Sequence, residues 1–504
     1  MYIRKTSQIK ISDDFFLPFG GKLNKENRWV KLAKLIPWHE FEERYASNFK
    51  PTNKGEQALS VRVALGALII KTKLKLTDEE VPEMVMENPY LQYFLGYDGF
   101  EDTKPPFDSS LMTHFRKRLS PDVMMEINEA IANEGLKNIK KENKDDDDDN
   151  DNSGNDGSSH SLDEIENELD SGQISLDDIM HRGKMILDAT CAPSDIRYPT
   201  DLHLTNEARE KTEEIIDVLH APDIGIKEKP RTSRVVARKN YLSLEKKRKK
   251  HKKALKKGIK KQLSYLKRNL RYIDKYIEED GRIDLLSKRQ KAELEIIRKL
   301  YEQQQYMYKN NTHSVTDRIV SISQPHVRPI VRGKAGSAVE FGCKVATSVV
   351  SGYTFFENLS FDSFNEGTLL KESVKSYYER FGCLPEAVLA DSIYRNRENL
   401  RWLKKLGIRI SGPKLGRKPK YVDPEVKRIQ KEDSGERNAV EGTYGVAKRK
   451  YNLDLIKSKR EDTAKTEIIL QFMVMNLDHS LRFILHFFLR IRSFQTWNIV
   501  SIGL

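Results

Sequence analysis

Three acidic residues occupy positions where a carboxylate could take part in chemistry. Asp188 interrupts the short apolar run of residues 184–191, and Asp391 follows the apolar run of residues 387–390. The length and composition of both runs are typical of buried strands. A carboxylate inside such a strand is costly unless something pairs with it, and a bound cation is one such partner. The alternative is that Asp188 bonds to nearby backbone amides at the strand end.

The third acid, Glu441, lies in a segment predicted to form the last helix of this domain. If Arg437 is placed at zero degrees, the helical period puts Glu441 at about 40 degrees and Lys448 at about 20 degrees. Tyr444 then lies at about −20 degrees on the same face. This face presents an acid, two cations and a phenol, whereas Glu436 points elsewhere. The alternative is a surface pair of Arg437 and Glu441, worth a few tenths of a kcal/mol.

The elements between the acids suggest how the acids are positioned. Ser351-Gly352 separates two strand-like runs and predicts a hairpin. The predicted order after the first strand and an insertion is strand, strand, helix, strand, helix, strand, helix. The ranges are 339–349, 352–361, 367–381, 387–391, 394–406, 408–411 and a last helix from about 435. This is the order of the RNase H-like fold, whose first and fourth strands are neighbours and whose following helix brings its acid to their ends.

Three convergent carboxylates need compensating charge. Two Mg²⁺ or Mn²⁺ ions, roughly 3.5–4 Å apart, would supply it and would hold the attacking and leaving oxygens of a phosphoryl transfer. We therefore predict that Asp188, Asp391 and Glu441 are both catalytic and metal-binding. Asp195 and Asp201 are rival ligands by position, but we predict structural roles for them because the strand end gives Asp188 the better-defined place.

A helical insertion is predicted at residues 200–312. Residues 246–261 hold eleven Lys or Arg in sixteen positions, and apolar residues recur beneath them at intervals of three and four. Asp280-Gly281 breaks the pattern, and a returning helix follows at 283–308. We interpret the insertion as a helical hairpin with one basic arm that contacts phosphates, the alternative being a solvated helix.

The first 140 residues are predicted to form a separate all-α domain. Residues 57–71 are apolar all round, which is typical of a buried helix. The short helix after residue 110 is expected to point Arg116, Lys117 and Arg118 outward, either to read DNA or as a solvated face. Residues 141–160 include five consecutive aspartates, so we predict a disordered acidic linker there.

Composition narrows the class of partner. The net charge is +13 and the pI is about 9.2, which favours a polyanion, nucleic acid before membrane. The three cysteines are widely spaced, which argues for a reducing compartment and against a thiolate zinc site. The apolar tail at 481–504 carries arginines and a histidine, and is too short and too charged to span a bilayer.

The chain resembles the DDE transposases of bacterial insertion sequences, closest to the IS-five-like branch with an N-terminal helical domain. The resemblance rests on LDATCAPSDIRYPTDL, RPIVRGKAGSAVEFGCKV, LADSIYRNREN, SGPKLGRKPK and RNAVEGTYGVAKRKYNL. Related transposases carry the signature Tyr, two residues, Arg, three residues, Glu, six residues, Lys. Arg437, Glu441 and Lys448 fit this signature, but Ser434 occupies the tyrosine position. Tyr444 lies on the same face but does not fill that position.

The resemblance implies an α/β protein with an RNase H-like mixed five-stranded sheet, flanking helices, the inserted hairpin and the N-terminal domain. The implied catalytic domain spans residues 161–480. The implied reaction is metal-dependent cleavage at transposon ends followed by attack of the 3′-hydroxyl on target DNA. The implied partners are double-stranded DNA and, in the DNA complex, further copies of the chain, without a membrane; the implied location is the bacterial cytoplasm, associated with the nucleoid.

The same resemblance implies that Arg437 and Lys448 contact DNA phosphates near the scissile bond. A basic loop is expected to do the same or to be a plain solvated loop; its residues are Lys414, Arg417, Lys418 and Lys420. Two alternatives remain open at this point. One is an RNase H-like nuclease that cuts without joining, and the other is a non-catalytic, transposase-derived DNA-binding protein.

Overall fold

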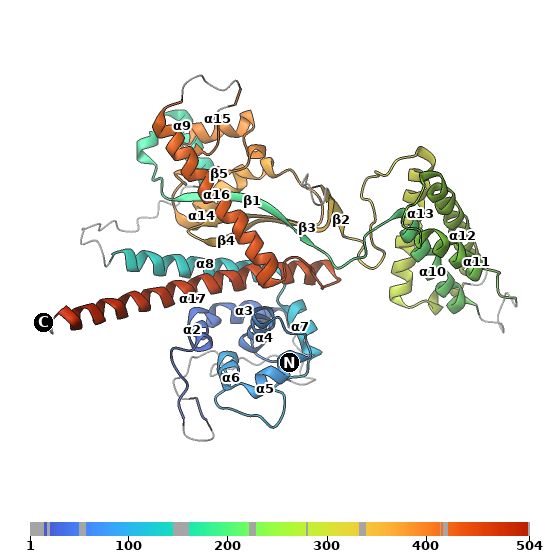
Figure 1. Cartoon of the computed structure of the whole chain (residues 1–504), viewed down its shortest axis with the longest axis horizontal. Helices are drawn as coiled ribbons and strands as arrows, with labels where there is room; N and C mark the ends of the chain where they lie inside the picture. The colour runs from blue at the N-terminus through green and yellow to red at the C-terminus, as the bar shows by residue number, and fades with distance from the viewer. Residues whose placement is uncertain are drawn as a thin grey trace.

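The computed structural model describes residues 15–17, 21–49, 57–144, 161–220, 228–278, 281–331, 339–413, 415–416 and 422–501. Three parts are visible in Figure 1: an N-terminal helical bundle, a sheet covered by helices, and a helical insertion that stands to one side. The acidic run at 145–160 lies outside the described residues, so the prediction of a disordered linker stays a prediction. Residues 141–144, which we had placed in the linker, instead continue a helix.

The sheet contains the five predicted strands and one more. The strands are β1 (Lys184–Pro193), β2 (Arg328–Val331), β3 (Val339–Val350), β4 (Tyr353–Ser360), β5 (Ala387–Ala390) and β6 (Arg409–Ile410). β3 runs antiparallel to β1 on one edge, and its other edge pairs with β2 near its start and with β4 near its end. β5 lies parallel to β1, and β6 lies parallel to β5. The additional strand, β2, leads from the insertion into β3.

This strand order confirms the predicted RNase H-like fold. Reading across the sheet, β4 and β3 precede β1, and β5 and β6 follow it. The first predicted strand, β1, therefore lies beside the fourth, β5. All four residues of β5 are buried, as expected for a parallel strand covered on both faces. The hairpin between β3 and β4 turns at Ser351 and Gly352, whose φ values of 48° and 86° are those of a primed turn.

Helices and short 3-10 turns cover the sheet. The helices are α8 (Pro121–Lys144), α9 (Leu162–Ser171), α14 (Leu370–Phe381), α15 (Arg397–Lys405) and α16 (Pro424–Tyr451). The 3-10 turns here are Leu176–Asp178, Glu366–Thr368 and Ser392–Tyr394. α8, which the sequence assigned to the N-terminal domain, packs against β4 and against the last helix, and its Ala132 and Leu136 are buried in the core under the sheet.

The predicted start of α16 near residue 435 is wrong by about three turns. The helix begins at Pro424, with Asp423 accepting a hydrogen bond from the backbone of Glu425 at 2.9 Å. Its first turns are mostly charged and lack apolar periodicity, so the pattern did not reveal them. An ion pair between Arg409 of β6 and the buried Asp433 fixes this part of the helix to the sheet.

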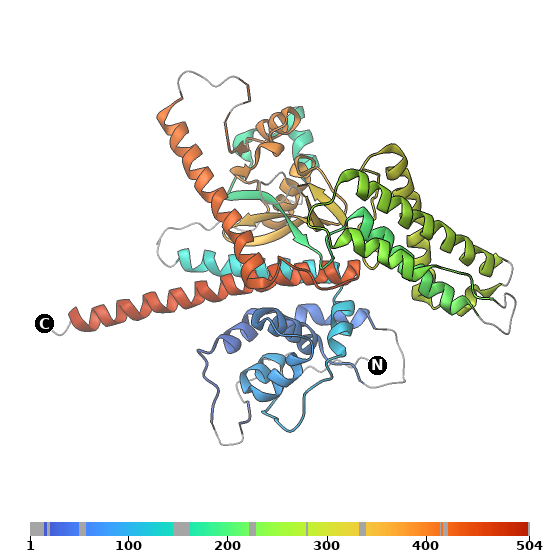
Figure 2. The same ribbon diagram turned by 45° about the vertical axis from the view of Figure 1, so that its right-hand side comes forward.

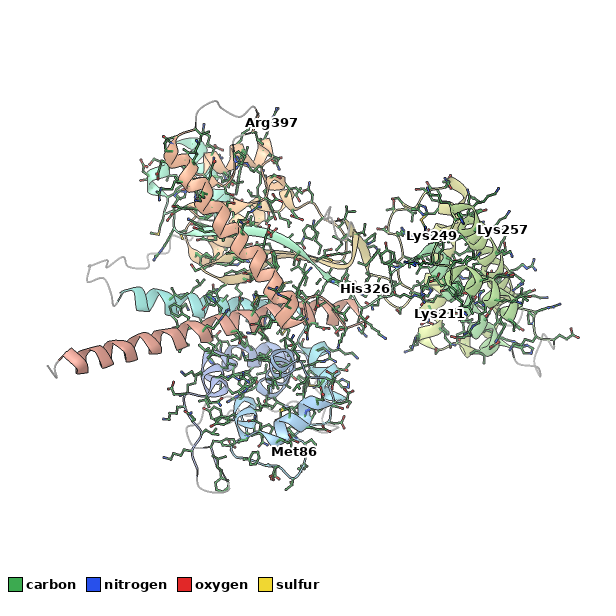
Figure 3. All side chains as sticks on the ribbon, viewed as in Figure 1. Met86, Lys211, Lys249, Lys257, His326 and Arg397 are labelled. Carbon is green, nitrogen blue, oxygen red and sulfur yellow. The ribbon has the colours of Figure 1, made fainter. Side chains whose placement is uncertain are left out.

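The insertion contains four helices and not a simple hairpin. They are α10 (Asp201–Leu219), α11 (Arg234–Glu245), α12 (Lys252–Glu278) and α13 (Lys288–Asn310), with a 3-10 turn at Arg282–Leu285. α12 and α13 form the predicted hairpin, but α10 packs extensively on α12 and completes a separate core. The basic residues 246–250, which we had placed inside the helix, form the exposed connection between α11 and α12 (Figure 3).

The N-terminal bundle is built around a helix that is buried on all sides, as predicted. The helices are α2 (Arg28–Leu35), α3 (Trp38–Ser47), α4 (Val61–Leu74), α5 (Glu80–Glu87), α6 (Pro89–Leu95) and α7 (Leu111–Arg118). Residues 61–70 of α4 are all buried. Apolar packing against its neighbours therefore holds this bundle together.

The last helix, α17 (Glu461–Ser501), joins the bundle to the sheet domain. It runs between them in both views (Figures 1 and 2) and packs against α2, α4 and α7 on one side and α8, α16 and β4 on the other. One hydrophobic core consequently extends from Trp29 through Phe472 to Val345. The helix also continues through the region that we had expected to be a separate tail from residue 481. Among the described residues, no helix is long and apolar enough to cross a membrane.

Candidate active site

Asp188 and Asp391 lie side by side at the same edge of the sheet. β1 and β5 are parallel, and Leu187 of β1 is paired with Ala390 of β5. Asp188 follows Leu187 within β1, and Asp391 follows Ala390 directly after the end of β5. The pairing of the two strands therefore brings the two acids together. Asp188 accepts a hydrogen bond from its neighbour Ala189 at 2.8 Å, which is part of the backbone alternative raised by the sequence.

Helix α16 places Glu441 over this edge. The Arg437 guanidinium lies 3.2 Å from the Asp391 carboxylate and 3.9 Å from that of Glu441. One pocket of about 380 Å³ is lined by all three acids and by Lys448. The other residues of its wall include Lys344, Glu366, Ile330, Val331 and Tyr444. Glu436 is not among them, because its carboxylate pairs with Lys184 at 2.6 Å.

Tyr444 ties this helix to the strand that carries Asp188. Its phenol is buried, donates a hydrogen bond to the backbone carbonyl of Asp188 at 3.0 Å, and lies 2.6 Å from the hydroxyl of Thr347 on β3. Burial raises the pKa of Tyr444 well above its usual value. Tyr444 therefore serves as a neutral anchor. Ser434, at the signature's tyrosine position, is exposed.

The environment of Asp188 is unfavourable for a bare carboxylate. Burial raises the pKa of Asp188 to about 6, and the negative charges of Glu366 and Glu441 act in the same direction. The amide of Ala189 and the guanidinium of Arg437 oppose this shift of the pKa. Burial is therefore the main reason why an ionised Asp188 is unfavourable in this pocket, with a smaller contribution from the neighbouring acids.

Sequence reasoning missed two charged residues of the pocket wall. Lys344 of β3 lies 2.8 Å from the carboxylate of Glu366 and donates to the carbonyl of Phe364 at 2.8 Å. Lys344, which is paired with Cys191 on β1, lines the pocket together with that residue. Glu366 comes from a 3-10 turn in a polar connection and carried no sequence signal that set it apart from other surface acids.

The donor set of the pocket suits a hard divalent cation. Carboxylate oxygens are the ligands that Mg²⁺ and Mn²⁺ prefer, and the pKa of Asp188 is raised mainly because burial leaves its carboxylate poorly solvated, a cost that such a cation would offset. The described residues nevertheless contain no group of three or more acids, histidines or cysteines gathered closely enough to hold a metal ion. Instead, the guanidinium of Arg437 lies close to the carboxylates of both Asp391 and Glu441.

The other residues named from the sequence fall into different places. The expectation that Arg116 points outward is wrong, because its guanidinium makes two hydrogen bonds to Asp78, at 2.9 and 2.6 Å. Arg118 lies over the ring of Phe49 at 4.5 Å, whereas Lys117 is exposed. Lys414, Arg417, Lys418 and Lys420 lie outside the described residues.

The two rival acids do not line the pocket. Asp201 begins α10 and binds Arg318 at 2.9 Å and His313 at 3.2 Å. Asp195 is exposed and its backbone bridges to Ile456. Asp201 thus has the structural role that we predicted. Three cysteines are free and buried, without a disulfide among them.

Two parts of this chain match known protein families. Residues 18–118 match the family described as Transposase domain (DUF772), and residues 388–478 match the one described as Transposase DDE domain. The second match includes Asp391 and Glu441. A segment of 115 residues is 36% identical to a protein of Rhizobium meliloti described as "Uncharacterized protein ORF8 in nfe locus". That segment covers 23% of this chain and 54% of that protein, about half its length. No solved structure matches the chain.

Proposed function

We propose that this chain is a DDE transposase of an insertion sequence, a proposal supported by its two matched transposase domains, and that it binds the terminal inverted repeats of its element and catalyses metal-dependent cleavage and strand transfer. The branch that we propose for it is the IS-five-like one. Its partners under this proposal are transposon-end and target DNA and, in the DNA complex, further copies of the chain. It would act in the bacterial cytoplasm, associated with the nucleoid.

One observation carries the catalytic part of the proposal. Asp188, Asp391 and Glu441 come from two strands and a helix that are far apart in the sequence, and they line a single pocket. A surface pair of Arg437 with Glu441 would not require Asp188 and Asp391 to occupy the same edge of the sheet. The arrangement supports a pocket in which acids and cations together surround the reacting phosphate.

Within this proposal, Asp188, Asp391 and Glu441 hold two Mg²⁺ or Mn²⁺ ions. Bound there, the ions would supply Lewis-acid activation of the phosphate and of the attacking oxygen. Lys448, which lines the pocket, would hold a DNA phosphate beside the acids. Arg437 would do the same once a cation replaces it as the partner of Asp391.

Sequence-specific binding belongs to the N-terminal bundle in this proposal. Lys117 is the exposed cation of α7, and Arg116 would act mainly by fixing α7, through Asp78, to the segment that precedes α5. The exposed basic connection at 246–250 would add salt-sensitive phosphate contacts.

Two assays separate the proposal from its alternatives. Metal-dependent nicking of terminal-repeat DNA distinguishes either enzyme from a non-catalytic DNA-binding protein. Joining of a 3′-hydroxyl terminal-repeat oligonucleotide to target DNA distinguishes the transposase from a nuclease that only cuts. We expect both activities; nicking without joining would replace the proposal by the nuclease, and binding without nicking would replace it by the non-catalytic protein.

A further inference from the structure

A cluster of cations lies where the N-terminal bundle, α16 and α17 meet, away from the candidate active site. Its centre is Asp478 of α17, which accepts hydrogen bonds from Tyr451 at 2.6 Å and Lys450 at 2.8 Å. Lys73 of α4 forms an ion pair with the same carboxylate. The side chains of Lys73 and Asp478 are only 9% and 6% exposed. One buried carboxylate thus joins three helices from distant parts of the chain.

Two arginines add to the positive charge around this carboxylate. Arg482, one turn further along α17, donates to the backbone carbonyl of Asp478 at 3.2 Å. Arg28 begins α2, which packs on α17. Both arginines lie close enough to lower the pKa values of Lys73 and Lys450, for which burial is the larger cause. Lys73 and Lys450 therefore contact the carboxylate of Asp478, Arg482 contacts its backbone carbonyl, and Arg28 lies near the two lysines on the adjoining α2.

The outer part of this cluster is accessible to a ligand. The Lys450 side chain is 57% exposed, and Arg28 and Arg482 are exposed. Neither arginine forms an ion pair within the described part of the chain. Like charges brought together at a surface cost free energy that a bound anion removes. The core of Lys73, Asp478 and Tyr451 positions Lys450 and Arg482, which both donate hydrogen bonds to Asp478.

We propose that Arg28, Lys450 and Arg482 form a binding site for the phosphates of a DNA backbone across the junction of the N-terminal bundle and the catalytic helix. The cations come from three helices, so they suit a ligand with repeated negative charges better than a single small anion. The net charge of +13 fits such a polyanion. Only the choice of DNA as the ligand rests on the proposed function.

This site is separate from the phosphate contacts proposed for the active site. Lys450 and Lys448 are two residues apart on α16, so their side chains leave the helix axis in directions about 160 degrees apart. Lys448 lines the pocket of the three acids, whereas Lys450 faces α17. DNA held at the junction would contact both the bundle and the helix that carries Glu441 (Figure 1), and would fix their relative position.

The test removes the three outer cations and leaves the core of the cluster in place. The full-length chain with Arg28→Gln, Lys450→Gln and Arg482→Gln is titrated with a short duplex of arbitrary sequence over a range of salt concentrations. We expect the slope of log K against log salt to flatten by about 2 to 3, because each lost phosphate contact removes about 0.9. The matched control replaces Arg401, Lys404 and Lys137, three exposed cations on α15 and α8, and should keep the parent slope.

The outcomes separate this inference from the proposed function. If the parent chain binds no duplex at all, the proposed function falls. If the parent binds and the triple variant keeps its slope, while its circular dichroism and thermal unfolding match the parent, the junction site is overturned. Poly-glutamate is the second probe. If the parent binds poly-glutamate, the triple variant does not, and both bind DNA equally, then DNA is the wrong ligand for this site and an acidic protein segment is the better one.

Discussion

The phenol of Tyr444 donates a hydrogen bond to the backbone carbonyl of Asp188, 3.0 Å away. This contact joins the helix of the third acid to the strand of the first, three residues from Glu441. It is reinforced by Thr347, which is paired with Asp188 across the sheet and lies 2.6 Å from the same phenol. Together with the ion pairs of α16 with Arg409 and Lys184, this buried hydroxyl therefore sets the relative position of Asp188 and Glu441.

Tyr444→Phe tests this positioning role. The substitution keeps the ring and leaves the Asp188 carbonyl and Thr347 without the phenol, so we expect a loss of roughly 1–2 kcal/mol in the free energy of unfolding. We also expect cleavage to fall by about tenfold or more, because a small displacement of Glu441 is costly in rate. Denaturant unfolding and nicking assays measure the two effects.

Tyr353→Phe is the control for that experiment. Its phenol is also buried and bonds to Ser480 at 3.0 Å, but it does not line the pocket. It should lose comparable stability and keep the parent rate of cleavage. Equal losses of rate in both variants would mean that Tyr444 acts only through general stability.

Asp188 gives a prediction for stability without metal. The pKa of Asp188 is about 6 in the folded chain, against 3.8 for an ordinary Asp, which is the value we take for the unfolded chain. Between these two pH values the folded state therefore binds more protons than the unfolded state. Stability then falls as pH rises through this window, by up to roughly 3 kcal/mol from 1.36 kcal/mol per pKa unit. We expect Asp188→Asn to stabilise the metal-free chain by roughly 2–3 kcal/mol at pH near 8, and to lose this advantage near pH 4.

Denaturant unfolding in a chelating buffer at several pH values measures this effect. Asp391→Asn is the matched control, because Asp391 is exposed and paired with Arg437, and its loss should not stabilise the chain. A variant at Asp188 that is no more stable than the parent at pH 8 would contradict the burial argument. Added Mg²⁺ or Mn²⁺ should stabilise the parent more than the Asp188→Asn variant.

The parts of the fold that the sequence predicted are those with dense apolar signals. The run that contains Asp188 and the run that precedes Asp391 form strands in which half of the residues of β1 and every residue of β5 are buried. The face of Arg437, Glu441 and Lys448 followed from the helical period alone. Both inferences need only local spacing, which a single sequence contains.

The parts that were missed depend on contacts distant in sequence. The first turns of α16 are charged and are held by the ion pair of Asp433 with Arg409, a partner that no local pattern reveals. Likewise Arg116 is one of three consecutive basic residues, yet its partner Asp78 comes from another segment. Glu366 meets Asp188 only because β3 and β4 fold back beside β1.

The packing of α8 and α17 changes what a truncation should do. α8 covers β4, and α17 contacts both the bundle and the sheet domain. The acidic run in the sequence suggested a domain boundary at residue 140. Deleting residues 1–140, however, removes nearly all of α8 and exposes apolar residues of α17. We expect such a fragment to be insoluble or partly unfolded by circular dichroism. A fragment beginning at 120 keeps α8 on β4 but still exposes the side of α17 that packs against α2, α4 and α7, so it should retain more helical and strand content than the first fragment and still aggregate more readily than the parent.

The basic connection of the insertion gives a further prediction. Replacing Lys246, Lys247, Arg248 and Lys249 with Gln should weaken binding to all duplexes alike and flatten the salt dependence. Lys250 is left intact as part of the structure, because it pairs with Glu245 at 2.7 Å. Fluorescence anisotropy with terminal-repeat and unrelated duplexes measures both quantities. An unchanged slope would identify these residues as a solvated connection.

The last prediction compares two glutamates of α16. Glu441→Gln keeps size and hydrogen bonding but removes a charge from the pocket, so we expect folding and DNA binding to persist and nicking to fall by at least about a hundredfold. Lys448→Ala removes a proposed phosphate contact and should leave residual nicking with weaker binding near the cleavage site.

Glu436→Gln is the matched control, since Glu436 lies on another face and pairs with Lys184 at a partly exposed site. Loss of that pair should cost no more than about 1 kcal/mol and leave nicking near the parent rate. Nicking of terminal-repeat DNA with Mg²⁺ or Mn²⁺ is measured for the three variants beside the parent. An inactive Glu436→Gln beside an active Glu441→Gln would reverse the assignment, because the pocket of Asp188 and Asp391 would then not contain the glutamate that the reaction needs.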